Sequence, residues 1–305
     1  MEETKSVQII VCCRVIHLLC EERGFDPVKG SVDPDFLVRM VNPTDEHALE
    51  MALLLRGRMK AEITVLAVTP PEDEEILRRA LAMGVDRACR IWDGGFETIR
   101  ASATAYVLAA AIRRLQGDLI LCGQKAMDTN EMELGGYLAE FLSLPQISGV
   151  TALEVAGERG PLICHRRAER KGWDLVKTPI PVVVTTERGE NEPRYPTIFS
   201  ILDWLEKEIP VLNLASLGID EEILKDWNTM VKVLGWTRPK PKRIFTPPSD
   251  LAPEERIRLA LTGGLGTKKA KLLTGEAKEI VPQLIDVLVK QKFFKGNGEK
   301  SNGRG

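Results

Sequence analysis

A polar loop between two glycines follows the apolar segment 119–122. It begins at Gly123 and leads to Gly135, near which the sequence predicts the start of a helix. Free backbone N–H groups and the positive end of a helix at such a place can hold the phosphate groups of a nucleotide. An ordinary strand-to-helix loop with a flexible glycine would look the same. The other candidate residues of this loop are Asp128, Thr129, Asn130, Glu133 and Leu134.

Two further loops could contribute to the same site. Asn42, Pro43 and Asp45 precede a helical pattern, although Asp45 could serve simply as the cap of that helix. Thr69 follows the apolar segment 62–68, and the two prolines after it prevent further sheet pairing and turn the chain outward. We therefore treat both loops as candidate ligand contacts.

The sequence lacks the motifs of several common catalytic sites. Its three histidines, His17, His47 and His165, are scattered and form no metal-binding spacing with cysteine or aspartate, so we expect no metal site. It contains no GxSxG motif, no GxxxxGK[ST] loop and no GxGxxG motif after a predicted strand. Catalysis by a nucleophile or by a paired acid and base has no basis in these residues.

A parallel sheet is needed to bring the three loops together. Apolar segments at 7–13, 62–68, 119–122 and 180–186 predict strands buried on both faces. Strands that alternate with helices predict an α/β fold with a mostly parallel sheet and helices on both faces. Ligands bind outside the carboxyl ends of the strands in such sheets, which is where the candidate loops lie. Helical patterns occur at 45–58, 72–83 and 98–115.

Composition divides the chain into three parts. Residues 1–235 predict one α/β domain, with a small hairpin at 150–174. Residues 236–293 begin with a proline-rich extended arm and end in a helix. The segment 294–305 is composed mainly of Gly, Lys and Asn, so we expect a disordered tail.

Charge and cysteine usage exclude several classes of partner and location. The net charge of -2 gives no electrostatic reason to bind nucleic acid. The six cysteines form no CxxC pair, which favours reduced thiols over a disulfide framework. The first residues do not resemble a signal peptide, and no apolar segment approaches the roughly 20 residues needed to cross a bilayer. We expect a soluble cytoplasmic protein.

Several motifs resemble those of electron-transfer flavoprotein β subunits. They occur in the same order and at suitable distances, over about residues 7–217. The most specific is LRRALAMGVDRA, which resembles the family's LRxALAMGADRA. The matching segments are 77–88, 42–48 (NPxxExA), 119–128 (DLIxxGxQAxD), 144–146 (LPQ) and 192–197 (EPRYPT, close to EPRYPS).

The resemblance implies a fold of the adenine-nucleotide α-hydrolase type and a heterodimer with an α subunit that carries most of the FAD. It implies electron relay from an acyl-CoA dehydrogenase-type partner, as in fatty acid oxidation, with a membrane quinone oxidoreductase as a further candidate partner. The chain would be an electron carrier rather than an enzyme on its own, and its arm and last helix would pack on the α subunit. A partner-recognition loop is implied near 187–208. Its contact residues would be Glu192, Pro193, Arg194, Tyr195, Ile198 and Leu202.

The resemblance also implies a second nucleotide in this chain, either AMP or, in electron-bifurcating members that oxidise NADH, a second FAD. AMP-binding members read Asn-Gln-Thr-Gly where this chain has Met132, Glu133, Leu134 and Gly135. A carboxylate facing a phosphate is unfavourable, so Glu133 must point away, bind a cation or reflect a different use of the site. The aliphatic Leu134 favours a second FAD, with AMP as the alternative. The implied contacts are Val11, Cys12, Asn42, Pro43, Asp45, Thr69 and the loop 128–135.

Overall fold

The computed structural model describes residues 6–26, 29–94, 96, 99–157, 160–168, 172–189, 191–229, 246–261 and 275–290. The chain divides into two units, Met1–Thr237 and Arg238–Gly305, which we describe separately. The expected tail at 294–305 and the first part of the proline-rich arm lie outside the described residues.

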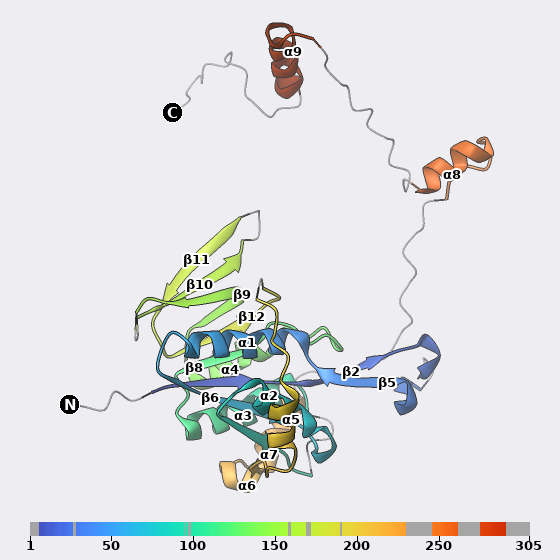
Figure 1. Cartoon of the computed structure of the whole chain (residues 1–305). Helices are drawn as coiled ribbons and strands as arrows, with labels where there is room; N and C mark the ends of the chain where they lie inside the picture. Colours follow the sequence, from blue (N-terminus) through green and yellow to red (C-terminus); the bar gives the residue numbers. More distant parts are fainter. Residues whose placement is uncertain are drawn as a thin grey trace, which may run out of the picture. The chain divides into compact units, whose positions relative to one another are not determined.

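A nine-stranded sheet forms the centre of the first unit (Figure 1). The strand order is β11-β10-β9-β12-β8-β1-β6-β7-β13. Each neighbouring pair along this order from β9 to β13 is parallel, whereas β10 pairs antiparallel with both β9 and β11. The predicted mostly parallel sheet is therefore confirmed. The strands are β1 Val7–Cys12, β6 Ala61–Val68, β7 Arg87–Ile91, β8 Leu119–Gly123, β9 Gln146–Val155, β10 Leu162–Arg167, β11 Trp173–Thr178, β12 Val182–Thr186 and β13 Val211–Leu212.

Helices cover both faces of this sheet, as predicted. One apolar core joins the sheet to α1 (Pro43–Arg56) and α2 (Glu75–Met83). The core on the other face contains α3 (Ala101–Leu115) and α4 (Leu134–Leu142). Because both faces are covered, the central strands carry uninterrupted apolar residues. Shorter elements of this unit are η1 Glu22–Gly24, η2 Pro34–Phe36, η3 Pro71–Asp73, α5 Ile198–Leu205, α6 Leu214–Leu217 and α7 Glu221–Thr229.

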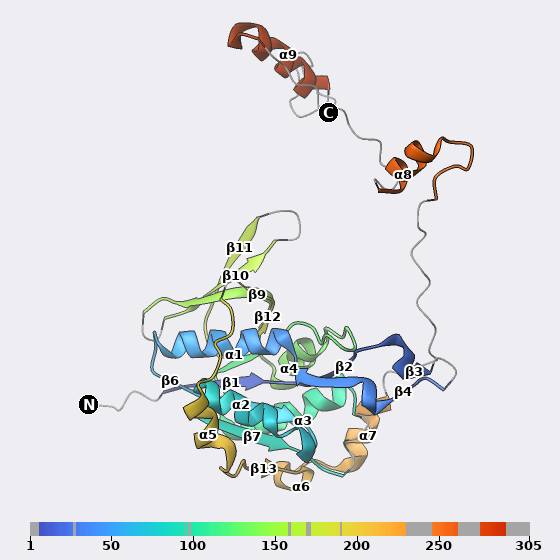
Figure 2. The same cartoon turned by 45° about the vertical axis from the view of Figure 1, so that its right-hand side comes forward.

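Two antiparallel features differ from the sequence-based expectation. The expected hairpin at 150–174 is a three-stranded extension, because β9 starts earlier and pairs with β12 of the main sheet, which makes β11 an edge strand. A second hairpin, which we did not predict, follows β1 and extends beyond the sheet (Figure 2). It consists of β2 Val15–Leu19 and β5 Leu37–Val41, with the short pair β3 Phe25–Asp26 and β4 Ser31–Val32 between them.

The second unit contains two described helices. Helix α8 (Pro253–Leu261) begins where the proline-rich segment ends, and α9 (Ala277–Lys290) matches the helix expected near the C-terminus. Pro282 lies inside α9, near its beginning. In the described part of the chain, no helix combines the length and apolar character required to cross a membrane.

Candidate functional site

A cavity of about 900 Å³ lies at the carboxyl ends of β1, β6, β7 and β8. Strand β1 pairs with β6 on one side and β8 on the other. The helix that precedes β6 and the helix that precedes β8 pack on opposite faces of the sheet. Such a topological switch point is the usual ligand site of an open α/β sheet. The volume lies near the upper end of the roughly 300–1,000 Å³ found for small-molecule and cofactor sites.

Asp45, in the first turn of α1, connects two of the loops around the cavity. Its buried carboxylate accepts hydrogen bonds from the backbone N–H groups of Gly123, at 2.6 Å, and Arg14, at 2.8 Å. Burial raises the pKa of Asp45 from 3.8 to about 7, although these hydrogen bonds act in the opposite direction. The side chain can therefore change its charge near neutral pH.

Gly123 is required by the close approach of α1 to the end of β8. A Cβ atom at this position would lie 2.2 Å from Thr44 Oγ1 and 2.3 Å from Asp45 Oδ1. The backbone N–H of Gly123, which we expected to be free for a phosphate, is instead bonded to Asp45. This glycine therefore admits the start of α1 rather than offering an N–H group to a ligand.

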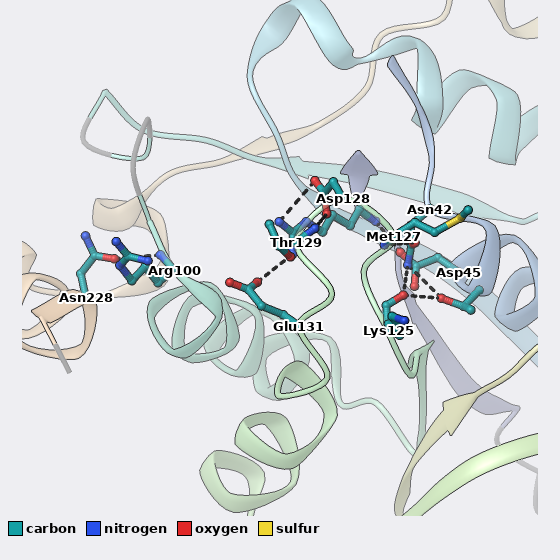
Figure 3. Close-up of polar contacts among 11 residues, drawn as sticks. Asn42, Asp45, Arg100, Lys125, Met127, Asp128, Thr129, Glu131 and Asn228 are labelled. Carbon is teal, nitrogen blue, oxygen red and sulfur yellow. Dashed lines mark hydrogen bonds and ion pairs between the residues drawn. The ribbon is translucent and has the colours of Figure 1, made fainter. Parts of the chain in front are cut away.

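Asn42 joins the start of α1 to the loop after β8 (Figure 3). Its amide nitrogen donates to the Lys125 carbonyl at 3.0 Å, and its amide oxygen accepts from the Met127 N–H at 3.2 Å. The Thr44 hydroxyl donates to the same Lys125 carbonyl at 2.8 Å. These bonds fix the path of the loop independently of any ligand.

Arg14 balances part of the negative charge in the loop before α4. Arg14, two residues after the end of β1, lies 3.2 Å from Glu131 and 3.6 Å from Asp128. Glu133 is exposed and does not line the cavity. Among the three expectations for this residue, this position agrees with a side chain that points away from the ligand. The loop carries Thr129 on the cavity wall.

A second charged cluster closes the side of the cavity next to the β2–β5 hairpin. Asp73, just after β6, pairs with Arg39 at 3.2 Å and lies 3.9 Å from His17. Thr69 donates to the same carboxylate at 3.5 Å. The unpredicted hairpin thus supplies part of the wall.

The cavity brings together about half of the nucleotide contacts predicted from the sequence. The remaining predicted residues lie nearby without lining it: Val11 is in the apolar core, Pro43 is the first residue of α1, and Gly135 packs against Thr185. Asn130 adopts a left-handed conformation with φ of 64° in the turn before α4. Asp128 pairs with Arg14, as described above. The predicted residues that line the cavity are Cys12, Asn42, Asp45, Thr69, Gly123, Thr129 and Leu134.

Several lining residues were not anticipated from the sequence. Arg14 directly follows a predicted strand, so the strand-end rule that led to the other candidates could have identified it. Trp92 and Phe96 follow β7, a short strand that the apolar pattern did not reveal. Arg100 was placed inside the helix predicted at 98–115, but α3 begins at Ala101, so Arg100 lies at its N-terminal end.

A separate segment, 191–207, is fastened to the helices on the α1 face of the sheet. The Arg194 guanidinium donates to both carboxylate oxygens of Glu50, at 2.8 to 3.2 Å, and its backbone N–H donates to the same group. Glu50 is buried in α1, and this bidentate bond raises the pKa of Arg194. Nearby, His47 Nδ1 lies 3.1 Å from the Asn191 carbonyl. The far end is held by Arg78 of α2, which donates to the carbonyls of Trp204 and Lys207.

Between these anchors the segment exposes apolar side chains. Tyr195 is 88% exposed, Ile198 68% and Leu202 59%. Glu192 is also exposed, and Pro193 is partly buried. A short helix held at both ends that presents uncovered apolar residues has the character of a protein-docking surface.

The chain is similar to several known proteins. Residues 37–216 match the family model described as Electron transfer flavoprotein domain. The chain is 32% identical to the electron transfer flavoprotein subunit beta of Megasphaera elsdenii over 94% of its own length and 100% of that protein. The corresponding protein of Clostridium acetobutylicum is 32% identical over 70% of this chain and 82% of the relative. The caffeyl-CoA reductase-Etf complex subunit CarD of Acetobacterium woodii is 30% identical over 71% and 82%.

Proposed function

Because this chain belongs to the electron-transfer flavoprotein β-subunit family, we propose that it forms a heterodimer with an α subunit and relays electrons through FAD. The donor would be an acyl-CoA dehydrogenase-type protein, and the FAD would be held mainly by the α subunit. FAD supplies the electron-accepting and electron-donating chemistry when it is bound. The chain itself would position partners and hold a second nucleotide.

The anchored segment 191–207 is the observation that carries this proposal. Two buried or half-buried anchors, Glu50 and Arg78, fix its ends, while Ile198 and Leu202 remain exposed between them. An apolar side chain held on a rigid support can enter a pocket of a partner at little entropic cost. This arrangement supports a docking role for Glu192, Pro193, Tyr195, Ile198 and Leu202. It supports an anchoring role for Arg194, which was expected to contact the partner.

The residues of the cavity fit an adenine nucleotide. Flat or apolar side chains such as Trp92, Phe96 and Ile99 can contact a ring system, and the hydroxyls of Thr104 and Thr129 offer hydrogen bonds to a ribose or phosphate. Burial raises the pKa of the Cys12 and Cys13 thiols well above the ordinary value, so both are neutral and unsuited to nucleophilic attack on a ligand. The cavity is therefore suited to binding rather than to covalent catalysis.

A second candidate function is electron bifurcation, with a second FAD in this cavity and NADH as the electron source. The volume of about 900 Å³ is large enough to admit a dinucleotide. Leu134 lines the cavity where AMP-binding members of the family carry Thr, and Glu133 lies outside it. The relative from Acetobacterium woodii is named for a complex with caffeyl-CoA reductase, which supports an enzyme acting on an acyl-CoA as the partner class.

Counting the nucleotides in the purified complex tests both candidates. The chain is co-purified with its α subunit and denatured, and the released nucleotides are identified and quantified by chromatography. One FAD and one AMP per heterodimer would support the simple electron carrier. Two FAD would support bifurcation and lead to assays of NADH oxidation, whereas release of no flavin would contradict the proposed function.

A further inference from the structure

Arg100 differs from the other arginines that line the cavity. Arg14 is ion-paired with two carboxylates of the loop before α4, and Arg39 is ion-paired with Asp73. For Arg100 the described residues provide no carboxylate within ion-pair distance of the guanidinium, although the residue forms part of the cavity wall. A cation in a partly enclosed site gains most from an anionic ligand when no internal anion already neutralises it.

The backbone of Arg100 is held in place by α7. The Arg100 N–H donates to the Asn228 side-chain oxygen at 2.8 Å (Figure 3). The buried Ser102 hydroxyl donates to the Trp227 carbonyl at 2.8 Å. The Trp227 ring packs in turn against Phe141, with ring centroids 4.8 Å apart. These contacts fix the backbone at the start of α3, so the side chain of Arg100 extends from a defined position on the cavity wall.

The two ends of the cavity differ in charge. The loop before α4 places Glu131 in the lining with Asp128 beside it, and the segment after β6 adds Glu72 and Asp73, so a phosphate placed near either segment would face carboxylates. The described lining residues around the start of α3 are neutral apart from Arg100 itself: Trp92, Phe96, Ile99, Ala101 and Thr104. In addition, the first turn of α3 contains no acidic residue. The end formed by α3 is thus the more favourable place for a phosphate.

We propose that Arg100 binds a phosphate group of the nucleotide held in this cavity, and that it makes the cavity prefer phosphorylated adenosine. The inference rests on the proposed nucleotide-binding function and specifies the end of the cavity at which the phosphate lies. A guanidinium can form two parallel N–H···O bonds with a phosphate, which a lysine ammonium at the same position would reproduce only in part.

Calorimetric titration of the full-length chain with ADP and with adenosine tests this role. The chain is first freed of nucleotide by dialysis against concentrated potassium bromide and checked for cooperative thermal unfolding. We expect the parent chain to bind ADP more tightly than adenosine. Arg100→Gln should weaken ADP binding about tenfold to a hundredfold, the range for a charged hydrogen bond, and leave adenosine binding unchanged. Arg100→Lys should recover part of the loss.

Arg114→Gln serves as a matched control, because it removes the same charge from the exposed C-terminal end of α3. It should leave the binding of both probes unchanged. The role of Arg100 would be overturned if Arg114→Gln weakened ADP binding equally, or if Arg100→Gln bound ADP as tightly as the parent chain. Either result would leave the proposed nucleotide site intact. If the folded parent chain binds neither probe, the proposed nucleotide site itself is contradicted.

Discussion

At the residue scale, Asp45 gives the cavity a group that titrates near neutral pH. Its pKa of about 7 in the folded protein lies above the ordinary 3.8, so the folded chain holds this proton more tightly than the unfolded chain does. The tighter proton binding by Asp45 therefore stabilises the folded chain. This stabilisation is complete below the ordinary pKa and is lost as the pH rises through about 7. The loss is on the order of 4 kcal/mol.

Asp45→Asn should remove this pH dependence. The amide cannot accept from both Gly123 and Arg14 N–H groups as the carboxylate does, so the variant carries a constant penalty of about 1–3 kcal/mol. Urea denaturation across the range from about pH 4 to pH 8 should show the parent losing stability relative to the variant as the pH rises. Parallel stability curves for the two proteins would show that Asp45 does not titrate in this range.

At the element scale, the docking segment depends on the pair between Glu50 of α1 and Arg194. Glu50 has a side-chain exposure of 6%, so Arg194→Ala would leave a carboxylate buried without its partner. We expect a loss of about 1–3 kcal/mol in the free energy of unfolding and faster proteolytic cleavage within 191–207. Limited proteolysis combined with thermal unfolding measures both effects.

Arg188→Ala is the matched control for this pair. Arg188 is also exposed and precedes the same segment, and it forms no ion pair with any residue that the structure describes. Its substitution should change neither the cleavage rate nor the unfolding temperature. If Arg194→Ala and Arg188→Ala behave alike, the Glu50 pair does not hold the segment.

The elements that could be predicted from the sequence are those with a local signal. Strands β1 and β8 are continuous apolar segments, and α1 has helical spacing, so each was found within a few residues of its bounds. Strand β7 reads RACRI, which is short and half polar, and no local pattern separates it from a loop. The β2–β5 hairpin was missed for a similar reason, since Arg39 and His17 interrupt its apolar residues.

The same contrast explains what could be predicted of the site. Residues such as Thr69 and Asp45 follow strands or begin helices, so the strand-end rule and the family resemblance both led to them. The pairing of Arg39 with Asp73 depends on the fold of an unpredicted hairpin. The bond from Arg100 to Asn228 joins residues far apart in the sequence, and no local spacing reveals such a contact.

At the scale of the whole molecule, the two units should differ in what they need for stability. Both apolar cores consist of residues of the first unit, Met1–Thr237. In the second unit, α9 has 14 residues and leaves Val281 and Ile285 half exposed. Isolated helices of this length are marginal in water, so α9 needs a partner to cover its apolar side chains. The resemblance to the family makes the α subunit the expected partner.

A chain ending at residue 237 should therefore fold but bind the α subunit poorly. We expect its unfolding temperature to stay within a few degrees of the parent value, because the truncation removes no residue of either core. Its affinity for the α subunit, measured by calorimetry, should fall at least about tenfold, since the apolar face of α9 no longer contributes. A chain ending at residue 290 retains α9 and should bind like the parent. If the shorter chain binds the α subunit with full affinity, packing of the arm and α9 on the α subunit is contradicted. If the shorter chain no longer unfolds cooperatively, the independent folding of the first unit is contradicted.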